Sequence, residues 1–201
     1  MGFKIAILIS GRGSNMLNII EACNNKKLYS SVNLVVSNRP NAVGLKVANK
    51  YKVRTEILDS NNLTKENFEI LLDKILKKNN INLVCLAGFM KILSKDFIKK
   101  WPKMILNIHP SVLPSFKGLN AQRQAIENKA KYSGCTVHFV NEEMDSGEII
   151  DQKIVGISTN DDVDSLSKKI LMEEHKLYIK VLKKLEKNCG KNEQQTARKL
   201  L

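Results

Sequence analysis

Near its start the chain reads FKIAILISGRGSNMLNII (residues 3–20), and this stretch decides the class of fold. Phe3 to Ile9 is a near-continuous apolar run, which is typical of a strand buried on both faces of a sheet. A glycine-rich turn from Ser10 to Asn15 follows, and apolar residues at helical spacing come next, from Met16 to Ile20. Strand, turn and helix in this order predict the first unit of an α/β domain.

The same alternation continues along the chain. Further strands are predicted at 32–36, 55–58, 82–87 and 104–108, and helices at 42–51, 64–76 and 122–128. After Gly134, polar and apolar residues alternate, which predicts half-exposed strands at 135–140 and 149–157, and a long helix follows from Asp161. We therefore expect one doubly wound α/β domain with a mostly parallel, Rossmann-like sheet at residues 1–187, and a polar, flexible tail at 188–201.

Composition excludes several classes of protein. Hydrophobic residues at 43% and charged residues at 26% are typical of a globular chain rather than a disordered one. The apolar runs are far shorter than the roughly 20 residues that a membrane-spanning helix needs. The first residues lead directly into a strand without the pattern of a secretory signal, so we expect a cytoplasmic protein. The cysteines and histidines lack metal-binding spacing, and no metal is expected.

The net charge of +13 raises nucleic acid as a partner, because clustered lysines gain affinity by releasing phosphate counterions. The lysines are instead scattered over most predicted helices, and aromatic residues make up only 5% of the chain. A solvated, lysine-rich surface is therefore favoured, and no nucleic-acid partner is expected. The charge can still help to attract phosphorylated substrates.

The glycine turn Gly11-Arg12-Gly13-Ser14-Asn15 has the features of an anion site. It lies between a strand and a helix, where free N–H groups and the helix dipole favour a phosphate. Met16 stands where a dinucleotide-binding turn has its third glycine, and Asn38 and Arg39 stand where such a site has an acidic residue. We expect a monophosphate rather than NAD, although a turn that merely connects strand to helix remains an alternative.

The segment from Ile105 to Pro114 indicates acyl-transfer chemistry. Asn107 and His109 are two residues apart on a predicted strand, so both side chains point to the same face. An amide can stabilise a developing oxyanion while an imidazole moves a proton. Asp145 is the candidate carboxylate partner that would favour the protonated imidazole, although a solvated acidic turn is the more frequent explanation of such a loop.

Five stretches of the chain together resemble the phosphoribosylglycinamide formyltransferase family of purine biosynthesis. They are ILISGRGSN (7–15), VVSNRPNAVGL (35–45), LAGFMKILS (86–94), LNIHPSVLPSFKGLNAQRQAIE (106–127) and GCTVHFVNEEMDSGEII (134–150). The resemblance spans about residues 3–186. It implies the formyltransferase fold and direct transfer of a formyl group from 10-formyltetrahydrofolate to the amine of 5-phosphoribosylglycinamide.

The resemblance also implies roles for individual residues. Asn107, His109 and Asp145 match the catalytic trio of that family. Residues that match the binding site for the phosphate of phosphoribosylglycinamide are Gly13, Ser14 and Asn15, and Glu174 matches a contact to its ribose hydroxyls. Residues that match the formyl-folate site are Lys65, Met90, Lys91, Ile92, Leu93, Asn107 and Glu142. Lys65 departs from the pattern, because an arginine is common there and would bind bidentately.

Other functions were weighed against this one. Methionyl-tRNA formyltransferases share the Asn-x-His-Pro pattern but are expected to carry a further tRNA-binding domain and to differ at Lys117–Ala121. Formyltetrahydrofolate hydrolases are expected to carry a regulatory domain before the first strand. A non-catalytic nucleotide-binding or RNA-binding module is the third alternative. We expect small-molecule partners only, and a monomer or weak homodimer; His138 and His175 are expected to be structural residues satisfied by their neighbours.

Overall fold

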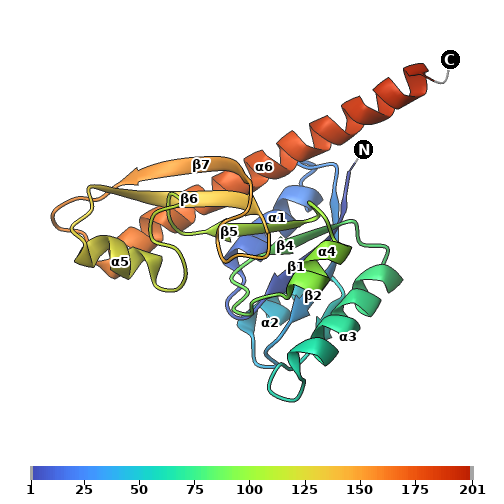
Figure 1. Cartoon of the computed structure of the whole chain (residues 1–201), viewed down its shortest axis with the longest axis horizontal. Coiled ribbons are helices and arrows are strands. Elements are labelled where there is room, and N and C mark those ends of the chain that lie inside the picture. Colours follow the sequence, from blue (N-terminus) through green and yellow to red (C-terminus); the bar gives the residue numbers. More distant parts are fainter. Residues whose placement is uncertain (1, 200–201) are drawn as a thin grey trace.

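The computed structural model describes the backbone of residues 2–199 and the side chains of residues 2–189. One seven-stranded sheet runs through the molecule in the order β3-β2-β1-β4-β5-β6-β7 (Figure 1). Its strands are β1 (Lys4–Ile9), β2 (Ser31–Ser37), β3 (Thr55–Ile57), β4 (Leu83–Leu86), β5 (Ile105–His109), β6 (Tyr132–Phe139) and β7 (Ile149–Gly156). The first five strands pair in parallel, and β6 and β7 add antiparallel pairs at one edge. The predicted α/β class and mostly parallel sheet are confirmed.

Helices cover both faces of this sheet, as a doubly wound fold requires. Buried residues of α1 (Ser14–Asn24), α2 (Val43–Lys50), α5 (Ala121–Glu127) and α6 (Val163–Lys199) form one apolar cluster with one face of the sheet. Buried residues of α3 (Lys65–Lys78) and α4 (Lys95–Lys100) form a second cluster with the other face. Neighbouring strand residues alternate between the clusters, since Ile7 belongs to the first and Leu8 to the second.

The strand order reverses direction between β1 and β4. From β1 the chain proceeds outward to β2 and β3, and it then returns to place β4 and β5 on the other side of β1. At such a switch point the loops after the two neighbouring strands diverge and leave a crevice at their carboxyl ends, where open α/β sheets bind ligands. The turn after β1, the loop after β4 and the last residues of β5 carry many of the predicted site residues. Glu142 and Asp145 follow β6, Lys65 begins α3, and Glu174 lies on α6.

Element boundaries follow local signals closely. Thr64 caps α3 as predicted, because its side chain accepts a hydrogen bond from the Asn67 N–H. Helix α4 was missed by the sequence analysis, although Ser94 caps it in the same way, because six residues are too few for a visible apolar period. Helix α6 extends to Lys199; the side chains from residue 190 on lie outside the described residues, so the flexible tail at 188–201 stays a prediction.

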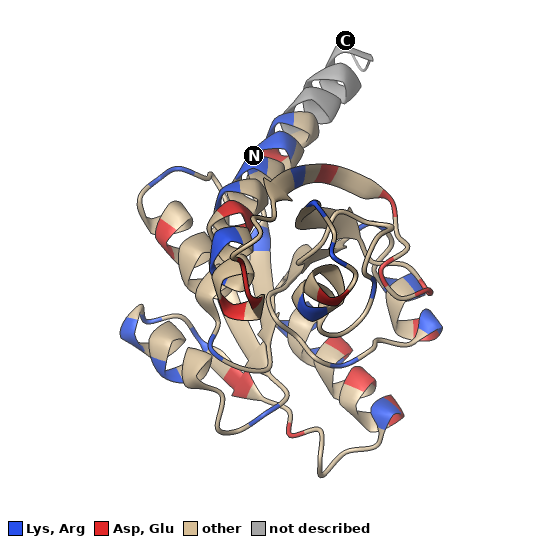
Figure 2. Cartoon of the chain, turned by 90° about the vertical axis from the view of Figure 1, so that its left-hand side faces the viewer, with Lys and Arg blue, Asp and Glu red and all other residues tan. Residues whose placement is uncertain are grey.

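Basic and acidic residues are interspersed over the surface, as Figure 2 shows for one side of the molecule. Several lysines are paired with carboxylates, for example Lys77 with Asp73 and Lys169 with Asp161. This arrangement fits the solvated, lysine-rich surface that the sequence favours. In the described part of the chain, helices are too short or too polar to cross a membrane.

Candidate active site

The glycine turn after β1 is held tightly between two helices. Gly13 adopts left-handed backbone angles (φ 73°, ψ 34°) immediately before α1, a conformation that glycine adopts at little cost. A Cβ on Gly13 would lie 3.2 Å from the Cα of Gly44 in α2, and the Gly44 N–H donates to the Gly11 carbonyl at 3.0 Å. The start of α1 has no side-chain cap, so its first N–H groups can serve an anion.

Asn15 joins this turn to α6. Its Nδ2 donates to Oε2 of Glu174 at 2.7 Å, and both side chains are buried. Burial raises the pKa of Glu174 to about 7, although the hydrogen bond from Asn15 opposes this effect. The fold thus brings Glu174, far away in the sequence, to the end of the predicted phosphate turn.

The side chains of Asn107 and His109 lie on one face at the end of β5, as their spacing predicted. His109 is only 4% exposed. Its Nδ1 lies 3.2 Å from Oδ2 of Asp145, and its Nε2 lies 2.8 Å from the carbonyl oxygen of Phe116. Both neighbours accept hydrogen bonds, and a neutral imidazole has only one N–H to donate. A neutral ring can therefore donate to only one of these two acceptors at a time.

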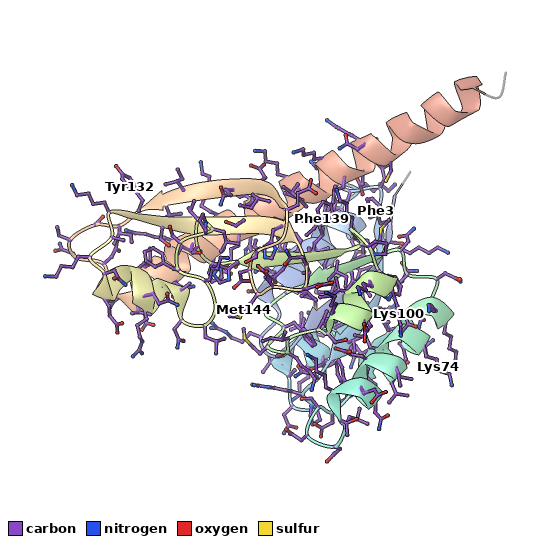
Figure 3. All side chains as sticks on the ribbon, viewed as in Figure 1. Phe3, Lys74, Lys100, Tyr132, Phe139 and Met144 are labelled. Atoms are coloured by element: carbon purple, nitrogen blue, oxygen red, sulfur yellow. The ribbon has the colours of Figure 1, made fainter. Side chains whose placement is uncertain are left out.

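Asp145 is the centre of the cluster. It lies in the loop after β6; Phe139, at the end of that strand, and Met144, within the loop, are labelled in Figure 3. Its Oδ2 accepts a hydrogen bond from the Gly118 N–H at 2.9 Å, and Oδ1 lies 3.5 Å from Nδ2 of Asn107. Its backbone is left-handed (φ 50°), a conformation that costs an L-residue roughly 1 kcal/mol.

The carboxylate of Asp145 is stabilised in its charged form. Burial alone would raise its pKa, but the contact with His138, the Gly118 N–H and the charges of both histidines outweigh burial and lower the pKa. A carboxylate that stays charged can accept a hydrogen bond from the His109 ring. Asn107, His109 and Asp145, which the sequence analysis singled out, are thus in contact; their catalytic role stays a proposal.

His138 belongs to the same cluster, and the sequence analysis missed it by treating it as a structural residue. It is 2% exposed and pairs directly across the antiparallel ladder with Asn107. Its Nε2 lies 3.3 Å from Nδ2 of Asn107 and 3.7 Å from Oδ1 of Asp145, while Nδ1 contacts the Phe139 carbonyl at 2.8 Å. The Nε2 of His138 thus faces both the Asn107 amide and the Asp145 carboxylate. The other histidine, His175, lies on α6, and its Nε2 has no hydrogen-bond partner among the described residues.

Apart from Asn107 in β5, the predicted folate residues lie in three places. Met90 to Leu93, here called the 90–93 segment, connects β4 to α4; Met90 and Ile92 are 58% and 63% exposed, while Leu93 is buried. Lys91 places its Nζ 5.0 Å from the centre of the Phe68 ring, within range of a cation–π contact. Exposed apolar side chains on an anchored loop suit the flat, partly apolar surface of a folate ring.

Glu142 and Lys65 both lie close to α4. Glu142 forms an ion pair with Lys95 at the start of α4. Lys65, the first residue of α3, lines a cavity of about 590 Å³ between α3 and α4. The other residues that line the cavity include Glu69, Ser94 and Lys100, the last of which is labelled in Figure 3. Lys65 therefore faces a cavity at the far end of the 90–93 segment.

Comparison with known proteins identifies the family. The family described as formyl transferase matches residues 3–182, most of the chain. The chain belongs to the formyl transferase family. The chain is 38% identical over 182 residues to the phosphoribosylglycinamide formyltransferase of Haemophilus influenzae, and the match covers 90% of this chain and 85% of that protein.

Solved structures agree with this assignment. Glycinamide ribonucleotide transformylase 1 from Symbiobacterium toebii superposes on this chain with a TM-score of 0.88 at 39% identity, covering 90% of this chain and 86% of that one. Phosphoribosylglycinamide formyltransferase from Anaplasma phagocytophilum gives a TM-score of 0.87 at 39% identity, covering 94% and 88%. The resemblance predicted from the sequence is confirmed.

Other relatives are much longer than this chain. The trifunctional purine biosynthetic protein adenosine-3 of Gallus gallus is 42% identical over 176 residues, which are 87% of this chain but 18% of that protein. The corresponding human protein is 41% identical over 177 residues, which are 87% of this chain and 17% of that protein. The chain thus spans less than a fifth of these relatives.

Proposed function

We propose that this formyl transferase passes the formyl group of 10-formyltetrahydrofolate to the amine of 5-phosphoribosylglycinamide in de novo purine biosynthesis. The observation that carries the proposal is the buried contact of Asn107, His109 and Asp145 at the carboxyl end of β5. An amide donor, a protonated imidazole and a carboxylate in contact are the groups that acyl transfer to an amine requires. The relatives that match over nearly their whole length are named for the same activity.

The binding of phosphoribosylglycinamide rests on the turn after β1. Gly13, Ser14 and Asn15 hold the phosphate with N–H groups at the start of α1. Glu174 accepts hydrogen bonds from the ribose hydroxyls, and Asn15 keeps its carboxylate directed toward the turn. Because β4 and β5 follow β1 in the sheet, this substrate can extend from the turn toward His109.

The formyl folate lies against the loops on the other side of the catalytic cluster. The 90–93 segment contacts its ring, with Asn107 and Glu142 beside it, and Lys65 attracts its anionic tail. The 90–93 segment follows β4, Asn107 lies in β5, Glu142 follows β6 and Lys65 begins α3. Both substrates are small molecules, and the expectation of a monomer or weak homodimer stays a prediction.

The reaction replaces the bond from the formyl carbon to N10 by a bond to the glycinamide nitrogen, and its net effect on protons is to move one from the amine to N10. The glycinamide nitrogen attacks the formyl carbon, and its lone pair drives the carbonyl electrons onto oxygen. Asn107 Nδ2–H and protonated His109 donate to this oxyanion, for which the Nε2–H of His109 leaves the Phe116 carbonyl. The tetrahedral intermediate collapses, the bond from carbon to N10 of the folate breaks, and the proton lost by the amine reaches N10.

His109 transfers this proton with the help of water, and Asp145 supports the charge of the His109 ring. His109 protonates the departing N10 and regains a proton from the ammonium that attack has created, so the enzyme returns to its starting state. Asp145 stays charged throughout, since its pKa is lowered, and it stabilises the positive ring of His109. The overall products are formylglycinamide ribonucleotide and tetrahydrofolate.

The test is the absorbance change on deformylation of 10-formyl-5,8-dideazafolate, with and without phosphoribosylglycinamide. Wild type, His109→Ala and the control His175→Gln are compared, because His175 lies outside the cluster. We expect product only with phosphoribosylglycinamide, its loss in His109→Ala and its retention in His175→Gln. Product without phosphoribosylglycinamide would indicate a hydrolase instead. No product in either mixture would refute the proposal and direct attention to a tRNA substrate.

A further inference from the structure

A buried hydroxyl connects the phosphate turn to the 90–93 segment. Ser10 is the residue directly before Gly11, and it is 4% exposed. Its Oγ accepts a hydrogen bond from the Met90 N–H at 2.8 Å and donates to Oδ1 of Asn38 at 2.6 Å. Its own N–H donates to the Gly88 carbonyl at 3.1 Å. Two hydrogen bonds from one residue therefore hold the loop after β4 against the end of β1.

Asn38 extends the connection to a third loop. It follows β2, is 4% exposed, and donates from Nδ2 to Oγ of Ser60 at 3.2 Å. Its carbonyl oxygen accepts from the Ser60 N–H at 3.1 Å. Ser60 lies in the loop that leads to α3, whose first residue is Lys65. The loops after β1, β2, β3 and β4 thus meet at one group of hydrogen bonds, here called the Ser10–Asn38 junction.

In the Ser10–Asn38 junction, each polar group has a defined role as donor or acceptor. The Ser10 hydroxyl has a single hydrogen, which goes to Asn38, so its lone pair faces the Met90 N–H. Asn38 uses its oxygen for Ser10 and its nitrogen for Ser60, so it sets the orientation of the hydroxyl. Without the Ser10 hydroxyl, the Met90 N–H and Oδ1 of Asn38 would both lose their partners, which is unfavourable in a buried site.

The far end of the 90–93 segment is anchored separately. Glu69 of α3 accepts hydrogen bonds from both the N–H, at 2.6 Å, and the hydroxyl of Ser94. The segment is therefore fixed at two points while Met90 and Ile92 stay exposed between them. Because the second anchor is independent of Ser10, loss of the junction should free the Met90 end without unfolding α4.

We infer that Ser10, oriented by Asn38, is a positioning residue that holds the 90–93 segment at a fixed distance from the phosphate turn. The inference rests on the proposed function, since it assigns the segment to the formyl folate and the turn to the phosphate of the second substrate. A fixed spacing between the two loops sets the distance between the two reacting groups.

The experiment compares Ser10→Ala with the matched control Ser37→Ala. Ser37 is also a buried serine at the end of a strand, 0% exposed, but its hydroxyl bonds only to the backbone of Arg39. We measure kcat, the KM of each substrate, and hydrogen exchange of the backbone at residues 88–94, with 10-formyl-5,8-dideazafolate as the folate probe. For Ser10→Ala we expect about a tenfold rise in the folate KM, a change of less than about twofold in the KM of phosphoribosylglycinamide, and faster exchange at Met90.

The role of Asn38 is tested with Asn38→Ala and the double variant Ser10→Ala/Asn38→Ala. If Asn38 acts through Ser10, the folate KM of the double variant rises less than the product of the two single changes. If the folate KM of the double variant instead equals the product of the two single changes, the two residues act independently and Asn38 does not act through Ser10.

The outcomes separate the inference from the function on which it rests. If wild type shows no turnover, the proposed function fails, and the assignment of the segment to folate fails with it. If wild type is active but Ser10→Ala matches Ser37→Ala in folate KM and in exchange, only the positioning role of Ser10 is refuted. An equal rise in the KM values of both substrates would show general damage to the site and would also refute the positioning role of Ser10.

Discussion

Replacing Glu174 by glutamine should make the protein more stable at neutral and alkaline pH. Glu174 is buried on α6 with a single hydrogen bond, from Asn15. Its desolvated carboxylate has a pKa of about 7 instead of the ordinary 4.5. Glutamine has the same shape and can still accept the hydrogen bond from Asn15, but it needs no charge in the buried site.

The magnitude and its sign follow from the two pKa values. Below pH 4.5 the carboxyl group is protonated in both the folded and the unfolded chain, so its ionisation does not affect stability. Between pH 4.5 and about 7 the unfolded chain loses its proton first, and stability falls as the pH rises. Since one pKa unit corresponds to about 1.4 kcal/mol, the full loss above about pH 7 is about 3 kcal/mol.

Urea unfolding between pH 5 and pH 8 measures this effect for wild type, Glu174→Gln and the control Glu173→Gln. Glu173 is the neighbouring carboxylate on α6, paired at 2.7 Å with the exposed Lys176. The difference in unfolding free energy between Glu174→Gln and wild type should grow by about 2 to 3 kcal/mol over this range, while the control follows wild type. Parallel pH profiles for wild type and Glu174→Gln would refute the buried, proton-binding carboxylate.

Three further changes test the site. Asp145→Asn removes the charge that faces His109 and should lower kcat by about 10² to 10⁴, measured at saturating substrates; a kcat within tenfold of wild type would contradict the proton role. His138→Gln should lower kcat by about tenfold with little change in either KM, because it orients Asn107; a rise in KM alone would place it in binding instead. Gly44→Ala places a Cβ 2.6 Å from Ile9 Cδ1 and should lower the unfolding free energy by about 1 to 3 kcal/mol in a thermal melt, whereas Gly156→Ala, with nothing within 4 Å, should change it by less than about 0.5 kcal/mol.

The pair Asn107 and His109 could be found from the sequence because a strand places every second residue on the same face. That rule is local and does not depend on the rest of the fold. The pairing of Asp145 with His109 was only one of two explanations of an acidic turn. It depends on the loop after β6, which begins beside Leu106 near the start of β5 and folds back so that Asp145 contacts His109.

His138 shows the limit of local reasoning most clearly. Within its own strand it is one polar residue in an alternating pattern, which has many structural explanations. It enters the site because β6 runs antiparallel to β5 and sets it opposite Asn107. A strand shifted by one residue would turn it to the other face.

The sequence by itself determined the class of fold, the glycine turn after β1 and the strand that carries Asn107 and His109. Each of these depends on residues within one helical turn or a few strand positions, where periodicity and glycine placement act. The tertiary structure alone decided that Glu174 meets Asn15, that His138 joins the cluster, and that Ser10 connects the phosphate turn to the 90–93 segment. These contacts join residues far apart in the chain, and their existence depends on strand order and register, which no local pattern encodes.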